Sequence, residues 1–167
     1  MRKEDKFNVS DTLIVFGTNI RKVREMRNLT ISELADRAKY YRGCLSSVEY
    51  GEQNLRYEKA VGLARALDVS FPALFSRNFI NDVANENCNF SGSFQEDKFL
   101  LIFVENYKRE LMDKNLKQIN VHNATGQDRV VINRILKQKN GNPTIRTLAA
   151  LASVTGSELY SLFSRNT

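Results

Sequence analysis

The stretch LTISELADRAKYYRGCLSSVEYGEQN, residues 29–54, contains two short helical patterns separated by a turn. Thr30 followed three residues later by Glu33 is the pattern of a capping box, in which each side chain bonds to the other residue's backbone at a helix start. A helix is therefore predicted to follow Thr30 and to run to about Ala38. A second helix is predicted over about Arg42–Tyr50, because the glycine that follows is suited to end it.

Apolar residues on both sides of this stretch extend the pattern to five helices. Phe16, Ile20 and Val23 follow the spacing of one helical face, which predicts a helix before the stretch. Two more helices are predicted after it, at about Tyr57–Leu67 and Phe71–Phe75.

The apolar spacing of this unit recurs later in the chain. One series consists of Leu29, Leu34, Ala35, Leu45, Val48, Leu63, Ala64, Leu74 and Phe75, and the other of Leu116, Val121, His122, Ile132, Ile135, Leu151, Ala152, Leu162 and Phe163. The two series are 87 residues apart before Gly51 and 88 apart after it, because one residue is inserted in the later loop. This shared spacing predicts that the chain repeats one helical unit.

Helix signals in the second unit agree with a repeat. Helices are predicted over about Phe99–Asp113, Gln118–Thr125 and Arg129–Gln138. Gly126 marks the turn between the last two, and Asp128 is suited to cap the third helix. Asn142-Pro143-Thr144 opens a fourth helix.

The chain is therefore predicted to be all-α, with tandem five-helix domains at residues 10–78 and 98–167. Residues 79–97, FINDVANENCNFSGSFQED, are rich in Asn, Ser, Asp and Glu, which predicts a polar linker of partial order. The alternative is an extra short helix at Asn81–Asn87 that packs on the first domain.

Composition narrows the functional classes. The net charge of +6 is compatible with a nucleic-acid partner but is weak evidence alone. Neither a membrane span nor a secretion signal is predicted, so the expected location is the cytoplasm. Cys44 and Cys88 are expected to be reduced thiols. With His122 as the single histidine, no zinc site or other cofactor is predicted.

The opening stretch, followed by LARALDVSFPALF at residues 63–75, resembles the XRE family of helix-turn-helix domains, the family of phage Cro and repressor proteins. Members typically show the segments Leu-Ser-Gln-x-x-Leu-Ala, Ser-x-Ile-Glu-x-Gly and Leu-Ala-x-x-Leu, which correspond here to residues 29–35, 46–51 and 63–67. The resemblance implies lambda-repressor-like DNA-binding domains, and the second copy matches more loosely. Ile31 departs from the pattern, since the family often has a bracing Gln there.

The family commonly pairs an arginine of helix one with the glutamate that ends helix three. Arg24 and Glu49 stand at those positions, and Leu111 and Leu136 replace them in the second repeat. Both members are expected to change together, because burying one charge without its partner costs about 3–5 kcal/mol. Arg24 and Glu49 are therefore expected to be structural.

In this motif the third helix enters the major groove of DNA. By family position, the residues of the first domain expected to contact base edges are Arg42, Gly43, Ser46, Ser47 and Tyr50. The sugar-phosphate backbone of DNA is expected to be contacted from the turn by Tyr41, from the loop after the third helix by Asn54 and Arg56, and from the start of the second helix by Thr30. Arg42 is the sharpest candidate, since a guanidinium can hold guanine O6 and N7 together. The alternative for Arg42 is a phosphate contact. Gly43 is expected to permit close backbone approach, and Tyr40 to belong to the core.

The equivalent residues of the second domain are Gln118, Gln127, Arg129, Val130, Asn133, Arg134 and Lys137. Arginine suits guanine, asparagine suits adenine, and valine suits the methyl group of thymine. Lys117 replaces the usual capping Ser or Thr, so the helix after it is expected to start less securely. His122 is expected to be a packed, hydrogen-bonded side chain.

The predicted function is a sequence-specific transcription regulator that binds double-stranded DNA, with a homodimer on a pseudo-palindromic operator as the expected assembly. The alternative is that the second domain mediates dimerisation or binds a protein partner. Its first helix begins with more apolar residues than one helical stripe needs, namely Phe99, Leu100, Leu101, Phe103 and Val104.

The sequence bears on two further functional classes. An antitoxin-type autorepressor uses the same fold, and a toxin-wrapping tail is its expected sign. An enzyme is not predicted, because the sequence has no phosphate-binding glycine loop, no histidine-supported nucleophile and no spaced set of metal ligands.

Overall fold

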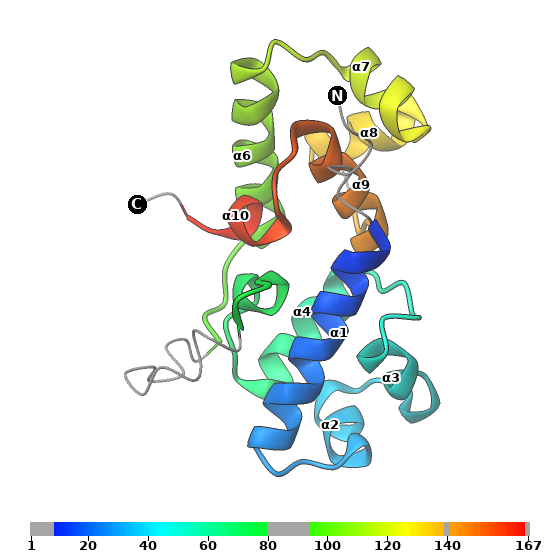
Figure 1. Cartoon of the computed structure of the whole chain (residues 1–167), viewed down its shortest axis with the longest axis vertical. Coiled ribbons are helices and arrows are strands. Elements are labelled where there is room, and N and C mark those ends of the chain that lie inside the picture. The colour runs from blue at the N-terminus through cyan, green and yellow to red at the C-terminus, as the bar shows by residue number, and fades with distance from the viewer. Residues whose placement is uncertain (1–8, 80–93, 139–140, 166–167) are drawn as a thin grey trace.

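The computed structural model describes residues 9–79, 94–138 and 141–165, and its regular elements there are helices (Figure 1). The N-terminal half, residues 9–79, contains α1 (Val9–Met26), α2 (Ile31–Ala38), α3 (Arg42–Glu49), α4 (Tyr57–Leu67) and the 3₁₀ helix η1 (Pro72–Phe75). The C-terminal half, residues 94–165, contains α6 (Phe99–Asp113), α7 (Gln118–Thr125), α8 (Arg129–Leu136), α9 (Ile145–Thr155) and α10 (Leu159–Phe163). The predicted all-α class is confirmed. None of the described helices is both long and apolar enough to cross a bilayer.

Helix bounds follow the sequence signals closely, with small differences. The third helix of each half is shorter than predicted, ending at Glu49 and Leu136. The segment predicted as Phe71–Phe75 is a 3₁₀ helix that begins at Pro72, whose ring presets the backbone for a first helical position.

Side-chain caps explain where the short helices begin. Thr30 Oγ1 accepts from Glu33 N at 3.2 Å, and the Glu33 carboxylate accepts from Thr30 N at 2.7 Å, so the predicted capping box is confirmed. Asp128 Oδ1 accepts from Val130 N at 2.7 Å, as predicted. At the start of α7, Asn120 Oδ1 accepts from Lys117 N, but an ammonium group has no acceptor to offer in return. The predicted weaker start of α7 therefore has a physical basis.

The backbone repeats as the apolar pattern does. Left-handed residues end helices at matching places in the two halves, 87 or 88 residues apart: Asn28 and Asn115, Lys39 and Gly126, Gly51 and Gln138, and Asp68 and Gly156. Such residues release the chain from a helix and place its last carbonyls for bonding. The halves thus share turn geometry as well as helix order.

A buried asparagine ties the first helix of each half to its last. Asn19 Nδ2 donates to the carbonyl oxygens of Leu74 and Ser76, both at 2.9 Å. Asn106, 87 residues later, donates in the same way to the end of α10, at 3.0 and 2.9 Å. Both amides satisfy backbone carbonyls that burial would otherwise leave without a partner. No local sequence pattern indicates this role for the two asparagines.

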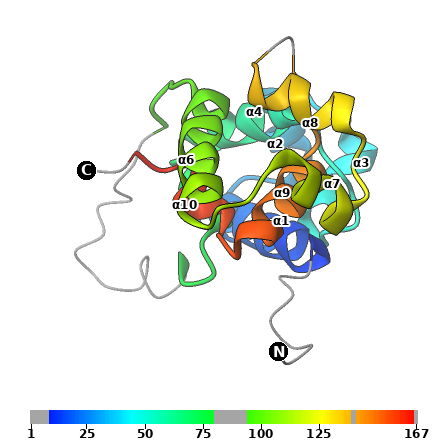
Figure 2. The same cartoon turned by 90° about the horizontal axis from the view of Figure 1, so that it is seen from above.

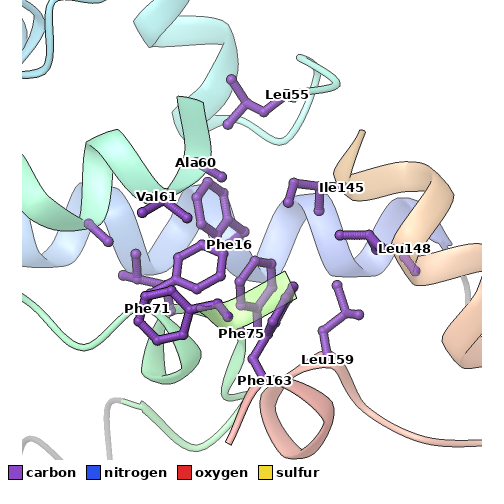
Figure 3. Packing of buried hydrophobic residues seen from close by; sticks show 14 of the residues in the cluster. Phe16, Leu55, Ala60, Val61, Phe71, Phe75, Ile145, Leu148, Leu159 and Phe163 are labelled. Atoms are coloured by element: carbon purple, nitrogen blue, oxygen red, sulfur yellow. The ribbon is translucent and has the colours of Figure 1, made fainter. Parts of the chain in front are cut away.

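The two halves pack directly on each other (Figure 2). Their buried apolar residues form one continuous cluster, to which α9 contributes Ile145 and Leu148 and the N-terminal half contributes Phe71, just before η1, and Phe75 of η1 (Figure 3). The Phe163 ring of α10 lies 4.9 Å from that of Phe71. The division into two domains therefore stays a prediction, because the core does not stop at the proposed boundary.

The apolar run that opens α6 is covered within the chain. The Phe99 ring lies 5.0 Å from that of Phe71, and Leu100 N donates to the hydroxyl oxygen of Tyr57 at 3.3 Å. Phe103 and Val104 are buried completely. Phe99 and Leu100 therefore cover the N-terminal half, and the hypothesis that the run forms a self-association surface stays a prediction that these contacts do not support.

The end of the predicted linker is ordered by specific contacts. Arg65 binds the Glu96 carboxylate at 2.9 Å, and its guanidinium lies 5.2 Å from the centre of the Phe94 ring. Asp97 pairs with Arg165 at 2.6 Å. These contacts fix the approach to α6. The alternative helix at Asn81–Asn87 lies outside the described residues.

Candidate nucleic-acid interface

The helix pair α2 and α3 presents one face to the core and the other to solvent. Leu34 of α2 and Leu45 and Val48 of α3 are buried, which sets the rotation of both helices. Lys39 has a left-handed backbone, and the chain turns there before α3 begins at Arg42. The first residue of α3 is therefore exposed at the open end of the turn.

A glycine allows α1 to lie against the end of α3. A Cβ atom added at Gly17 would overlap the carbonyl oxygen of Val48 and lie 2.9 Å from that of Glu49. Val104 of α6 stands at the equivalent position and is buried completely. Because a valine needs the space that Gly17 leaves open, α8 cannot approach α6 as closely at this point.

The charged pair predicted to be structural is present. The Glu49 side chain is only 4% exposed, and Arg24 is bound to it through two nitrogen atoms. The hydrogen bonds that Arg24 donates to the Glu49 carboxylate raise the pKa of Arg24 above its ordinary value. In the C-terminal half, Leu111 and Leu136 are both buried, as the paired replacement predicts.

The exposed face of α3 carries the residues predicted to contact DNA. Arg42, Gly43 and Tyr50 are exposed, and so is Thr30 at the start of α2. Ser46 and Ser47 are half-buried. The face thus offers one guanidinium, hydroxyl groups and an aromatic ring.

The ring of Tyr41 lies close to Gly43 on the exposed side of α3. The Tyr41 side chain is 76% exposed, and a Cβ added at Gly43 would lie 2.8 Å from its ring. The ring of Tyr41 therefore occupies the approach that Gly43 was expected to leave open for DNA. Tyr40 is half-buried against the core, and burial raises its pKa, in agreement with the core role predicted for it.

Two residues predicted to contact the sugar-phosphate backbone of DNA, Asn54 and Arg56, are instead bonded to the other half of the protein. Asn54 Oδ1 accepts from Arg146 N at 3.1 Å, and Arg56 Nη1 donates to the Asn142 carbonyl oxygen at 3.1 Å. These groups are engaged at the junction of the halves. No sequence pattern indicates these contacts, because the junction depends on how the halves pack.

The helix pair α7 and α8 presents a second, more basic face. Gln118, Arg129, Val130, Arg134 and Lys137 are exposed, while Gln127 and Asn133 are half-buried. Val130 is 57% exposed, which is unusual for a valine and leaves its methyl groups available for contact.

His122 of α7 has the structural role predicted for it. Its Nδ1 lies 2.8 Å from the carbonyl oxygen of Gln127, and the ring is half-buried. This contact holds the turn between α7 and α8.

Comparison with known proteins agrees with the geometry of the N-terminal half. The family described as Helix-turn-helix matches residues 20–74. The control protein C.SmaI of Serratia marcescens is 33% identical over 63 residues, which are 38% of this chain and 75% of that protein. No solved structure gives a significant match.

The chain belongs to the XRE-type helix-turn-helix family. Its matched region ends within η1, so the family match covers the N-terminal half. Members of the helix-turn-helix family are DNA-binding transcription regulators, and this chain is one of them.

Helices α3 and α8 lie on a common side of the molecule (Figures 1 and 2). In Figures 1 and 2, α3 and α8 occupy one side and α6 the opposite side. Arg21, which no sequence pattern indicates, also lies near this side: its guanidinium is 5.9 Å from the centre of the Tyr50 ring. Arg21 is on α1, outside the motif, so its position beside the exposed face depends on packing alone.

Proposed function

We propose that the protein binds double-stranded DNA sequence-specifically by inserting α3 into the major groove, and that α8 reads a second site. The observation that carries the proposal is the exposed face of α3 in a region that matches the helix-turn-helix family. In such motifs the second of the paired helices enters the groove and the first crosses the backbone.

In the N-terminal half, Arg42 reads base identity. It is exposed at the first position of α3, where a guanidinium can hold guanine O6 and N7 together. Ser46 and Ser47 accept or donate with little base preference. Thr30 contacts the DNA backbone, because free N–H groups at the start of α2 favour phosphate. The exposed Tyr41 contacts it from the turn before α3.

In the C-terminal half, several side chains of α8 differ from those of α3 in chemistry. Arg129 and Arg134 suit guanine, and Asn133 suits adenine. Val130 suits the methyl group of thymine. The exposed amide of Gln118 and the ammonium of Lys137 are assigned to phosphate.

The alternative in which the C-terminal half serves as a dimerisation or partner module has lost its main support. That alternative rested on the apolar start of α6, which packs against Phe71 and Tyr57 of the same chain. The exposed basic face of α8 instead favours DNA.

A salt titration of duplex binding tests the proposal. Affinity for random-sequence duplex should fall steeply as salt rises, since bound phosphates release counterions. Sequences selected from random DNA should show a preferred guanine that Arg42→Ala relaxes. Arg109→Ala is the matched control, because Arg109 is equally exposed but lies on α6, on the opposite side. Duplex binding that is absent or insensitive to salt would refute the proposal.

A further inference from the structure

The loops that follow α3 and α8 are joined across the chain by main-chain hydrogen bonds. Tyr57 N donates to the Pro143 carbonyl oxygen at 2.8 Å, and Ile145 N donates to that of Leu55 at 2.7 Å. Together they form an antiparallel bridge between Arg56 and Thr144. Each loop lies between the exposed third helix of its half and the fourth helix, so the bridge links the two faces.

Two asparagines at equivalent positions, 88 residues apart, reinforce this bridge reciprocally. Asn54 Oδ1 accepts from Arg146 N in the first turn of α9, at 3.1 Å. Asn142 Oδ1 accepts from Glu58 N in the first turn of α4, also at 3.1 Å. Each half therefore caps a helix of the other. Such reciprocity is the mark of an isologous interface, which two identical subunits normally form across a two-fold axis.

An apolar layer completes the same interface. Phe163 of α10 lies 4.9 Å from Phe71 and 5.4 Å from Phe75 of η1, measured between ring centres. All three rings are almost completely buried. The surface through which two copies of such a half would associate is therefore already covered by the other half of the same chain.

We propose that the protein is a built-in dimer, in which one chain occupies both half-sites of a single operator and the two half-sites differ in sequence. The inference rests on the proposed function of both faces. The half-sites differ because α3 presents Arg42 with two serines, whereas α8 presents Arg129 with Val130 and Asn133. The bridge between Arg56 and Thr144 fixes the distance between the half-sites.

Stoichiometry and selection test the built-in dimer. Mass measurement of the complex with a selected duplex should give one chain per operator, and the selected consensus should lack two-fold symmetry. Arg42→Ala should relax base preference in one half-site only, by about 5- to 150-fold at its position, and Arg129→Ala in the other half-site only. Two chains per operator, a palindromic consensus and changes at symmetry-related positions with Arg42→Ala would overturn the inference while leaving DNA binding intact. Loss of all salt-sensitive duplex binding would instead refute the proposed function.

Spacing between the half-sites gives an independent measurement. Ten extra base pairs restore the helical phase of the DNA but lengthen the distance by about one turn. A chain with linked faces should then bind no better than to a single half-site. Full affinity for the lengthened operator would show that the two faces move independently and would overturn the inference.

Discussion

Arg24 and Glu49 join α1 to the end of α3 through two hydrogen bonds, Nε to Oε1 at 2.5 Å and Nη2 to Oε2 at 3.0 Å. Arg24 also donates to the Leu29 carbonyl oxygen at 2.8 Å, so the pair fixes both ends of the helix-turn-helix to α1. The C-terminal half fills the equivalent space with Leu111 and Leu136. One fold thus holds its third helix by charge in one half and by apolar packing in the other.

Glu49→Ala is expected to lower the free energy of unfolding by about 3–5 kcal/mol, because it leaves the largely buried Arg24 without its partner. The double variant Arg24→Leu with Glu49→Leu copies the C-terminal half and should recover most of that loss. Urea unfolding of the three proteins measures both effects. A double variant as unstable as Glu49→Ala would show that a pair of leucines cannot replace the charged pair in the N-terminal half.

Gly17→Ala is expected to destabilise the protein by about 1–3 kcal/mol, because the added methyl group overlaps the Val48 carbonyl and forces α1 away from α3. The shift should also weaken DNA binding measured by fluorescence anisotropy. Gly62→Ala is the matched control: nothing lies within 4 Å of its added Cβ on α4. This control should gain about 0.5–1 kcal/mol through helix propensity. Equal effects of the two variants would contradict the close approach.

Local signals predicted the helices because their physical causes are themselves local. The Thr30–Glu33 capping box and the Asp128 cap depend on residues three or fewer positions apart, so the sequence displays them directly. The structural role of Arg24 and Glu49 could also be predicted, because leucines replace both of them in the second repeat and burial demands that both members change.

The contacts at the junction between the halves could not be predicted from the sequence. Asn54 and Arg56 were predicted to contact DNA because exposed polar loop residues beside a recognition helix commonly do so. Their contacts to Arg146 and Asn142 span 92 and 86 residues, and nothing in their neighbourhood signals such partners. The apolar start of α6 did signal an interface, but its partner proved to be the same chain.

Gln138→Gly is expected to raise stability by about 0.5–1 kcal/mol. Gln138 ends α8 with a left-handed backbone, φ 54°, which costs a residue with a Cβ more than it costs glycine. Gly51 holds the equivalent position after α3, at φ 73°. The reciprocal variant Gly51→Ala should be destabilising, because its Cβ would lie 2.7 Å from Ile14 Cα. Thermal unfolding measures both, and a lower midpoint for Gln138→Gly would contradict the argument.

Acid should weaken the start of α2 through Glu33. The hydrogen bond from the Thr30 backbone lowers the pKa of Glu33 below its ordinary value of 4.5. A carboxylate whose pKa is lower in the folded protein stabilises it above the ordinary pKa, and that contribution is lost as the pH falls through the folded pKa. Glu33→Gln retains an acceptor for the capping box but does not titrate. Thermal midpoints of the wild type should therefore fall relative to those of the variant below pH 4.5, whereas parallel curves across this range would mean that the carboxylate contributes nothing to the cap.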